Sequence, residues 1–99
     1  MSTQIATTED TTISFDLPSK YKVVLLNDNS TPMNFVIELL IGIFGKSTAE
    51  AKTITMQVHN DGSGIAGVYS YEIAEQKVYE ATTISRSYEY PLSFKIEKE

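Results

Sequence analysis

Six residues at positions 27–32, with the sequence Asn-Asp-Asn-Ser-Thr-Pro, form a polar cluster between two apolar segments. Asn27, Asp28 and Asn29 supply carbonyl and carboxylate oxygens, which accept hydrogen bonds from cationic amines. One interpretation is turn chemistry alone, because Asn and Asp side chains bond to their own backbone and tolerate unusual dihedral angles. The other is a binding site, in which these acceptors hold an ammonium group above an apolar groove that receives the attached side chain.

The apolar segment after the cluster is the candidate wall of that groove. Its polar positions, Asn34, Glu38 and Gly42, recur every fourth residue and form one narrow stripe on a helix. A sheet and two neighbouring helices would cover much of the remaining surface, so this helix is either fully buried or borders a groove lined by Met33 and Ile37. The flexible thioether of Met33 favours the groove, because methionine suits adaptable binding surfaces.

His59 is the single histidine and is predicted at the end of a helix. There it either complements the helix dipole or contributes to a site. A metal site would need ligands that no Cys or second His supplies, and no nucleophile elbow or ordered triad is present. We therefore predict no catalytic residue, no metal and no cofactor. A small hydrolase using Asp28 and His59, or a structural domain like that of the ribosomal stalk, are the alternatives.

The composition indicates one compact domain. The chain has 99 residues, of which 41% are hydrophobic, and it has no Cys, which excludes disulfides and fits a reducing compartment. The formal net charge of -5 comes from 8 basic and 13 acidic residues, and Arg86 is the single arginine. Because nucleic-acid binding needs clustered Lys and Arg, we expect no nucleic-acid partner and favour a basic protein surface.

The elements that must position the candidate site follow from the hydropathy pattern. A strand at 21–26 precedes the polar cluster, and a helix at 32–44 follows it, capped by Thr31 and ended by Gly45. A second helix begins at a reciprocal capping box, runs to about residue 59 and is followed by a strand at 65–70. The box residues are Ser47 and Glu50, and the glycines interpreted as turns and a bulge are Gly62, Gly64 and Gly67.

A third helix capped by Ser70 and a strand at 92–97 complete the order β-α-α-β-α-β. This order with short connections predicts an α+β fold, with three strands and helices on one side. The apolar stripe of the third helix comprises Ile73, Ala74, Val78, Ala81 and Ile84.

Residues 1–17 differ in composition from the rest of the chain. They are rich in Thr and poor in large apolar groups, which predicts a flexible tail before a domain at 18–99.

The longest apolar stretch, 35–44, is about half of the roughly 20 residues that a membrane span needs. No secretory signal or transit peptide is visible, so we expect a cytoplasmic protein without membrane contact.

Three segments together resemble the ClpS family, the adaptors that bring N-degron substrates to the Clp unfoldase–protease. They are "YKVVLLNDNSTPMNFVIELL", "AEAKTITMQVHNDGSGIAGVYSYEIAEQKV" and "YPLSFKIEK", and the resemblance spans about residues 18–98. It implies three antiparallel strands packed against three helices. It also implies a pocket for a bulky N-terminal residue, namely Leu, Phe, Tyr or Trp.

The resemblance assigns a role to each matching position. It implies that the substrate α-amino group binds at Asn27, Asn29 and His59, with Asp28 beside them. The implied hydrophobic pocket comprises Met33 as its gate and Ile37, Thr55, Val58 and Leu92. Glu72 and Lys77 match positions that contact the N-terminal domain of the unfoldase, and the expected protein is a monomer.

Two positions depart from the family pattern. Asn29 stands where Asp is usual, and the loss of that carboxylate is expected to weaken amine binding by about tenfold. Thr55 stands where a Met commonly lines the pocket. These departures leave open a second function, in which the protein docks on the unfoldase and modulates substrate choice with weakened N-degron binding. The resemblance also leaves the plastid stroma open as an alternative location.

Overall fold

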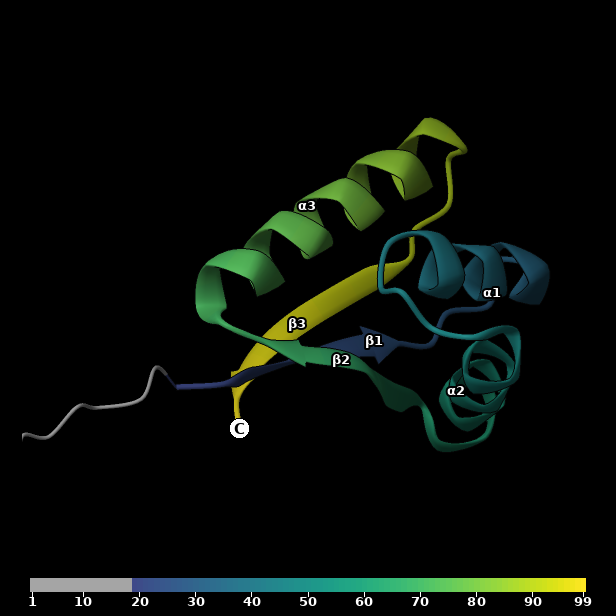
Figure 1. The fold of residues 1–99 in the computed structure, drawn as a ribbon. Coiled ribbons are helices and arrows are strands. Elements are labelled where there is room, and N and C mark those ends of the chain that lie inside the picture. Colours follow the sequence, from purple (N-terminus) through teal and green to yellow (C-terminus); the bar gives the residue numbers. More distant parts are fainter. Residues whose placement is uncertain (1–18) are drawn as a thin grey trace, which may run out of the picture.

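The computed structural model describes residues 19–99, so the tail predicted for 1–17 lies outside the described residues. Six elements follow one another in the predicted order, as Figure 1 shows. The predicted fold class is confirmed, since a three-stranded antiparallel sheet packs against three helices. The elements are β1 Tyr21–Leu26, α1 Met33–Gly42, α2 Thr48–Asp61, β2 Ser63–Tyr69, α3 Tyr71–Ser87 and β3 Ser93–Lys98.

The sheet has the strand order β2-β1-β3, which places β1 at its centre. Val23 and Leu25 of β1 are completely buried and belong to the hydrophobic core that the helices cover. β2 contains a bulge beside β1, because Val23 pairs with Gly67 and Val24 pairs with Ile65. The residue between, Ala66, is buried in the core. Hence β1 leads from the centre of the core directly into the polar cluster.

The start of α2 confirms the predicted capping box. The Glu50 N–H donates to Ser47 Oγ (3.1 Å), and the Ser47 N–H donates to Glu50 Oε1 (2.9 Å). The helix continues two residues beyond His59 and ends at Gly62, whose φ of 90° lies in the left-handed region that glycine adopts without strain. Both ends of α2 are therefore fixed by local interactions.

The predicted start and end of α1 are wrong. Pro32 occupies the N-cap, and Thr31 does not cap the helix because its hydroxyl donates to Asp28 Oδ2 (2.8 Å). The helix ends at Gly42 rather than Phe44. There the Lys77 ammonium from α3 donates to the Ile43 carbonyl (2.9 Å), which satisfies an acceptor that the helix end leaves unpaired.

The apolar stripe predicted for α3 is only partly buried. Ala74 and Ala81 are completely buried, as is Ser85, whereas Ile73 and Ile84 are 42% and 40% exposed. Each isoleucine precedes a buried residue by one position, which is about 100° around a helix. The small buried side chains let α3 approach the sheet closely, and the two isoleucines remain on its flank.

Candidate functional site

The site lies where the end of β1 meets the end of α2. The Asn27 N–H donates to the Gly62 carbonyl (3.0 Å), so the helix terminus that carries His59 is tied directly to the polar cluster. At Gly64, an added Cβ would lie 2.9 Å from Cγ2 of Val58. Because position 64 has no side chain, β2 can approach α2 closely, and the Val58 side chain lies directly against the strand.

Asp28 builds the turn that follows Asn27. Its Oδ1 accepts from the N–H groups of Ser30 (2.7 Å) and Thr31 (2.8 Å), and its Oδ2 accepts from the Thr31 hydroxyl. Burial acts to raise the pKa of Asp28, but these hydrogen bonds and the charge of Arg86 together hold this pKa below its usual value. The carboxyl is thus ionised at neutral pH and adds negative charge beside Asn27.

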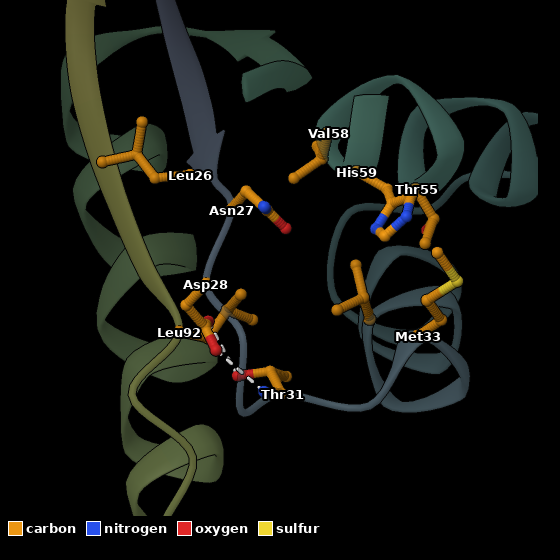
Figure 2. Close-up of a pocket in the computed structure, with 10 residues that line it drawn as sticks. Leu26, Asn27, Asp28, Thr31, Met33, Thr55, Val58, His59 and Leu92 are labelled. Atoms are coloured by element: carbon orange, nitrogen blue, oxygen red, sulfur yellow. Dashed lines mark hydrogen bonds between the residues drawn. The ribbon is translucent and has the colours of Figure 1, made fainter. Parts of the chain in front are cut away.

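The connection from α3 to β3 supplies the opposite wall. The Arg86 guanidinium donates to the carbonyls of Tyr90 and Leu92, both at 2.8 Å. These two bonds fix the backbone beside Leu92, whose side chain is only 2% exposed. The buried leucine lies on the side of the pocket near Asp28, away from α2 (Figure 2).

These elements enclose a small pocket with a volume of about 50 Å³. In Figure 2 the Asn27 amide and the His59 ring point toward one another across its mouth, while the Asp28 carboxylate turns toward Thr31. The hydroxyl of buried Thr55 donates to the Ala51 carbonyl (2.7 Å), so this oxygen is already paired. The lining residues are Leu26, Asn27, Asp28, Thr31, Met33, Val36, Thr55, Val58, His59 and Leu92.

Most of the residues predicted for the site lie together in this pocket, but two do not line it. Asn29 is exposed beyond the turn, because Asp28 bends the backbone there. Ile37 is half-buried and packs against the core. The predicted residues that do line the pocket are Asn27, Asp28, His59, Met33, Thr55, Val58 and Leu92.

Three lining residues were absent from the sequence prediction, namely Leu26, Thr31 and Val36. A signal existed for Val36, because it follows Met33 by three positions and residues at this spacing share one face of a helix. Ile37, at the next position, is half-buried and packs against the core without lining the pocket.

The two positions assigned to unfoldase contact have different surroundings. Glu72 is exposed in the first turn of α3. The ammonium of half-buried Lys77 donates to the Ile43 carbonyl and lies 5.3 Å from the centre of the Tyr69 ring. Lys77 therefore also joins α3 to the end of α1.

The chemistry available at the pocket is recognition of a cation attached to an apolar group. Asn27 and His59 present polar atoms at the mouth, and the walls below are mainly aliphatic. Among residues 19–99, no group of three or more His, Cys, Asp and Glu side chains is arranged to bind a metal ion. Within the same residues, the helices are too short or too polar to cross a membrane.

A comparison with protein families identifies the family to which the chain belongs. The family model of the ATP-dependent Clp protease adaptor protein ClpS matches residues 16–95. The chain belongs to the ClpS family. This membership makes it an adaptor of the Clp protease.

Individual relatives agree with the family assignment. The ClpS adapter of Acetivibrio thermocellus is 40% identical over 99 residues, which is 100% of both chains. That of Maricaulis maris is 49% identical over 82 residues, covering 83% of this chain and 75% of the relative. Among solved structures, Agrobacterium tumefaciens ClpS2 bound to L-phenylalaninamide is similar with a TM-score of 0.80 and 38% identity. The match covers 84% of this chain and 100% of that one.

Proposed function

We propose that this ClpS protein binds N-degrons, proteins that begin with Leu, Phe, Tyr or Trp, and delivers them to the Clp AAA+ unfoldase–protease. One observation carries the proposal: polar groups of Asn27 and His59 face one another directly above a pocket walled by buried aliphatic side chains. A relative with 38% identity binds L-phenylalaninamide, which has a free α-amino group beside an aromatic side chain.

In this binding mode the α-amino group is held at the mouth of the pocket. An ammonium donates three hydrogen bonds, so the Asn27 carbonyl oxygen and an unprotonated ring nitrogen of His59 are suitable acceptors. The Asp28 oxygens already accept three hydrogen bonds within the turn. Asp28 therefore orients the loop and contributes a nearby negative charge. Asn29 does not line the pocket, so it contributes to amine binding only from outside the lining.

The side chain of the N-terminal residue enters the apolar part, where its burial contributes roughly 1.5–3 kcal/mol. The pocket volume of about 50 Å³ is well below the roughly 150 Å³ of a cavity that holds benzene. An aromatic side chain therefore requires the pocket to open. Met33, which is 39% exposed at the rim, is the lining side chain best placed to move.

Delivery requires a docking surface apart from the pocket. We assign this role to Glu72 and Lys77, on α3, which contact the N-terminal domain of the unfoldase. The adaptor domain at 18–99 acts as a monomer in the cytoplasm, with the plastid stroma as the alternative, and residues 1–17 serve as its tail.

Binding of free and blocked N-termini by fluorescence anisotropy tests the N-degron proposal. Labelled peptides beginning with Phe, Leu, Tyr or Trp are compared with N-acetylated copies and with copies beginning with Ser. We expect saturable binding of the free peptides with bulky first residues and at least tenfold weaker binding of the acetylated ones, since acetylation removes the charge. Equal binding of the free and acetylated peptides contradicts the proposal.

The second candidate is a regulator that docks on the unfoldase but binds N-degrons weakly. The small pocket volume and the amide at position 29 favour it. In that case the wild-type protein shows no detectable binding of the free peptides at the concentrations of the anisotropy assay, yet changes which substrates the unfoldase–protease degrades. Asn29→Asp then restores peptide binding from nothing.

A further inference from the structure

A second, larger groove lies between α1 and the C-terminal half of α3. Its volume is about 460 Å³, and it is open to solvent along its length. An adjoining hollow along α3 shares Ile43 and Ile84 with it. The residues that line the groove are Asn34, Phe35, Glu38, Leu39, Gly42, Ile43, Ile84, Tyr88 and Tyr90.

One wall of this groove is a preformed aromatic surface. The Phe35 ring meets the Tyr90 ring edge-on at 4.8 Å, and the Tyr88 ring stacks on Tyr90 at 5.9 Å. Glu89 between the two tyrosines adopts a φ of 62°, a left-handed conformation that is unusual for a residue other than glycine. The hydrogen bond from Arg86 to the Tyr90 carbonyl holds this loop in place. Tyr88 nevertheless remains 62% exposed.

The opposite wall is the polar stripe of α1. Asn34 and Glu38 lie along it, and Gly42 leaves a space, since an added Cβ there would meet no atom within 4 Å. Ile84, which is 40% exposed, completes an apolar surface between the stripe and the tyrosines. The groove therefore offers both an apolar surface and vacant room for a side chain.

The charged groups around the groove make it acidic. Glu38 lies within it, and Glu80 lines the adjoining hollow. Arg86 and Lys77 keep their positive charges, but they donate to the carbonyls of Tyr90, Leu92 and Ile43 and line neither the groove nor the hollow. The charged side chain that a molecule entering the groove contacts directly is therefore the Glu38 carboxylate.

Charge decides between the possible occupants. Residues 1–18 of this chain contain Glu9, Asp10 and Asp16 but no Lys or Arg, and a second copy of the chain carries a net charge of -5. Neither therefore brings a net positive charge to the carboxylate of Glu38. We propose that the groove docks a segment of another protein that combines large aliphatic residues with Arg or Lys. Its cationic group pairs with Glu38 and stacks on the exposed Tyr88 ring, while its aliphatic residues cover Ile84.

A bead library of random N-acetylated nonapeptides tests this docking site, because acetylation removes the ammonium group that the N-degron pocket requires. The beads are incubated in parallel with the purified full-length protein and with two variants. Gly42→Trp fills the vacant space, and Glu38→Lys reverses the charge. We expect captured peptides rich in Arg or Lys together with Leu, Ile or Phe. Binding should be lost with Gly42→Trp and weakened about tenfold or more with Glu38→Lys. Both variants should bind a free Phe-peptide as the wild type does.

Several outcomes would overturn the docking proposal. They are capture of acidic peptides, capture that is the same with Gly42→Trp, and the lack of any captured peptide. Sedimentation of the wild type as a dimer that Gly42→Trp dissociates would assign the groove to a second copy. Stronger capture by a chain that lacks residues 1–17 would assign it to the tail. If the wild-type protein captures the acetylated peptides but does not bind a free Phe-peptide, the proposed N-degron function is contradicted and the groove proposal is unaffected.

Discussion

The pocket between β1 and α2 and the groove between α1 and α3 differ in how they are built. The pocket is small and held by backbone hydrogen bonds, notably from Asn27 to Gly62. The groove is about 460 Å³ and its wall consists of partly exposed rings. A tightly held site with a polar rim suits one invariant group, such as an α-amino group, whereas a broad apolar groove suits a side-chain pattern.

The largest expected difference between the two regions is in folding stability. Leu92→Ala removes a side chain that is 2% exposed, so we expect the free energy of unfolding to fall by roughly 2–5 kcal/mol. Tyr88→Ala in the groove should cost less than about 1 kcal/mol, because the ring is mostly exposed. Urea denaturation of both variants measures this difference. Equal losses would show that the groove wall is part of the core.

His59→Ala should reduce peptide affinity while leaving the free energy of unfolding almost unchanged. A hydrogen bond to a charged group contributes roughly 1.5–3 kcal/mol, so affinity for a free Phe-peptide should fall about 10- to 100-fold. His59 is exposed, and the free energy of unfolding should change by less than about 0.5 kcal/mol. Glu38→Gln in the groove is the matched control and should leave this affinity unchanged. Unaltered affinity in the His59 variant would remove this residue from the site.

Asp28 makes the stability of the pocket region sensitive to acid. Its pKa is lowered in the folded protein, so its stabilising contribution is present above the unfolded value near 3.8 and is lost as the pH falls through the folded pKa. Asp28→Asn should therefore reduce the free energy of unfolding at pH 7, by less than about 1 kcal/mol for this partly exposed carboxyl. Urea denaturation from pH 7 to pH 2 should show the difference from the wild type vanish toward acid. A difference that persists at pH 2 would contradict this role.

Asn29→Asp should give the smaller of the two changes in peptide affinity. Position 29 lies outside the pocket lining, so a carboxylate there acts mainly through its charge and should improve Phe-peptide affinity by less than about tenfold. Raising the salt concentration should reduce the gain, because exposed charges are screened. Anisotropy titrations at two ionic strengths measure both effects. Rescue from no binding would favour the regulator instead.

Features determined by neighbouring residues could be predicted from the sequence. The capping box of Ser47 and Glu50 depends on contacts within a few positions, and so does the end of α2, which was predicted about two residues too early. The strand predicted at 92–97 likewise lies within one residue of β3, Ser93–Lys98. These local signals were sufficient for the element order, whereas most of the residues that meet in the pocket were assigned by the resemblance to the ClpS family.

Features that depend on side-chain direction could not be predicted in the same way. The Thr31 hydroxyl had two possible partners, the helix backbone and Asp28, and only the folded turn decides between them. Val36 rather than Ile37 lines the pocket because the position of α1 against the core decides which side faces inward. The groove itself is bordered by Ile84, which lies on the flank of α3 because small residues hold that helix close to the sheet.

Titration of the isotope-labelled protein with L-phenylalaninamide, followed by NMR, tests most directly the claim that the pocket recognises an N-terminal residue. We expect saturable chemical-shift changes at Met33, Thr55, Val58 and Leu92, and none at Ile84 or Tyr88. N-acetyl-phenylalaninamide should cause no such changes at the same concentrations. Shift changes confined to the groove, or identical changes with the acetylated compound, would contradict the account.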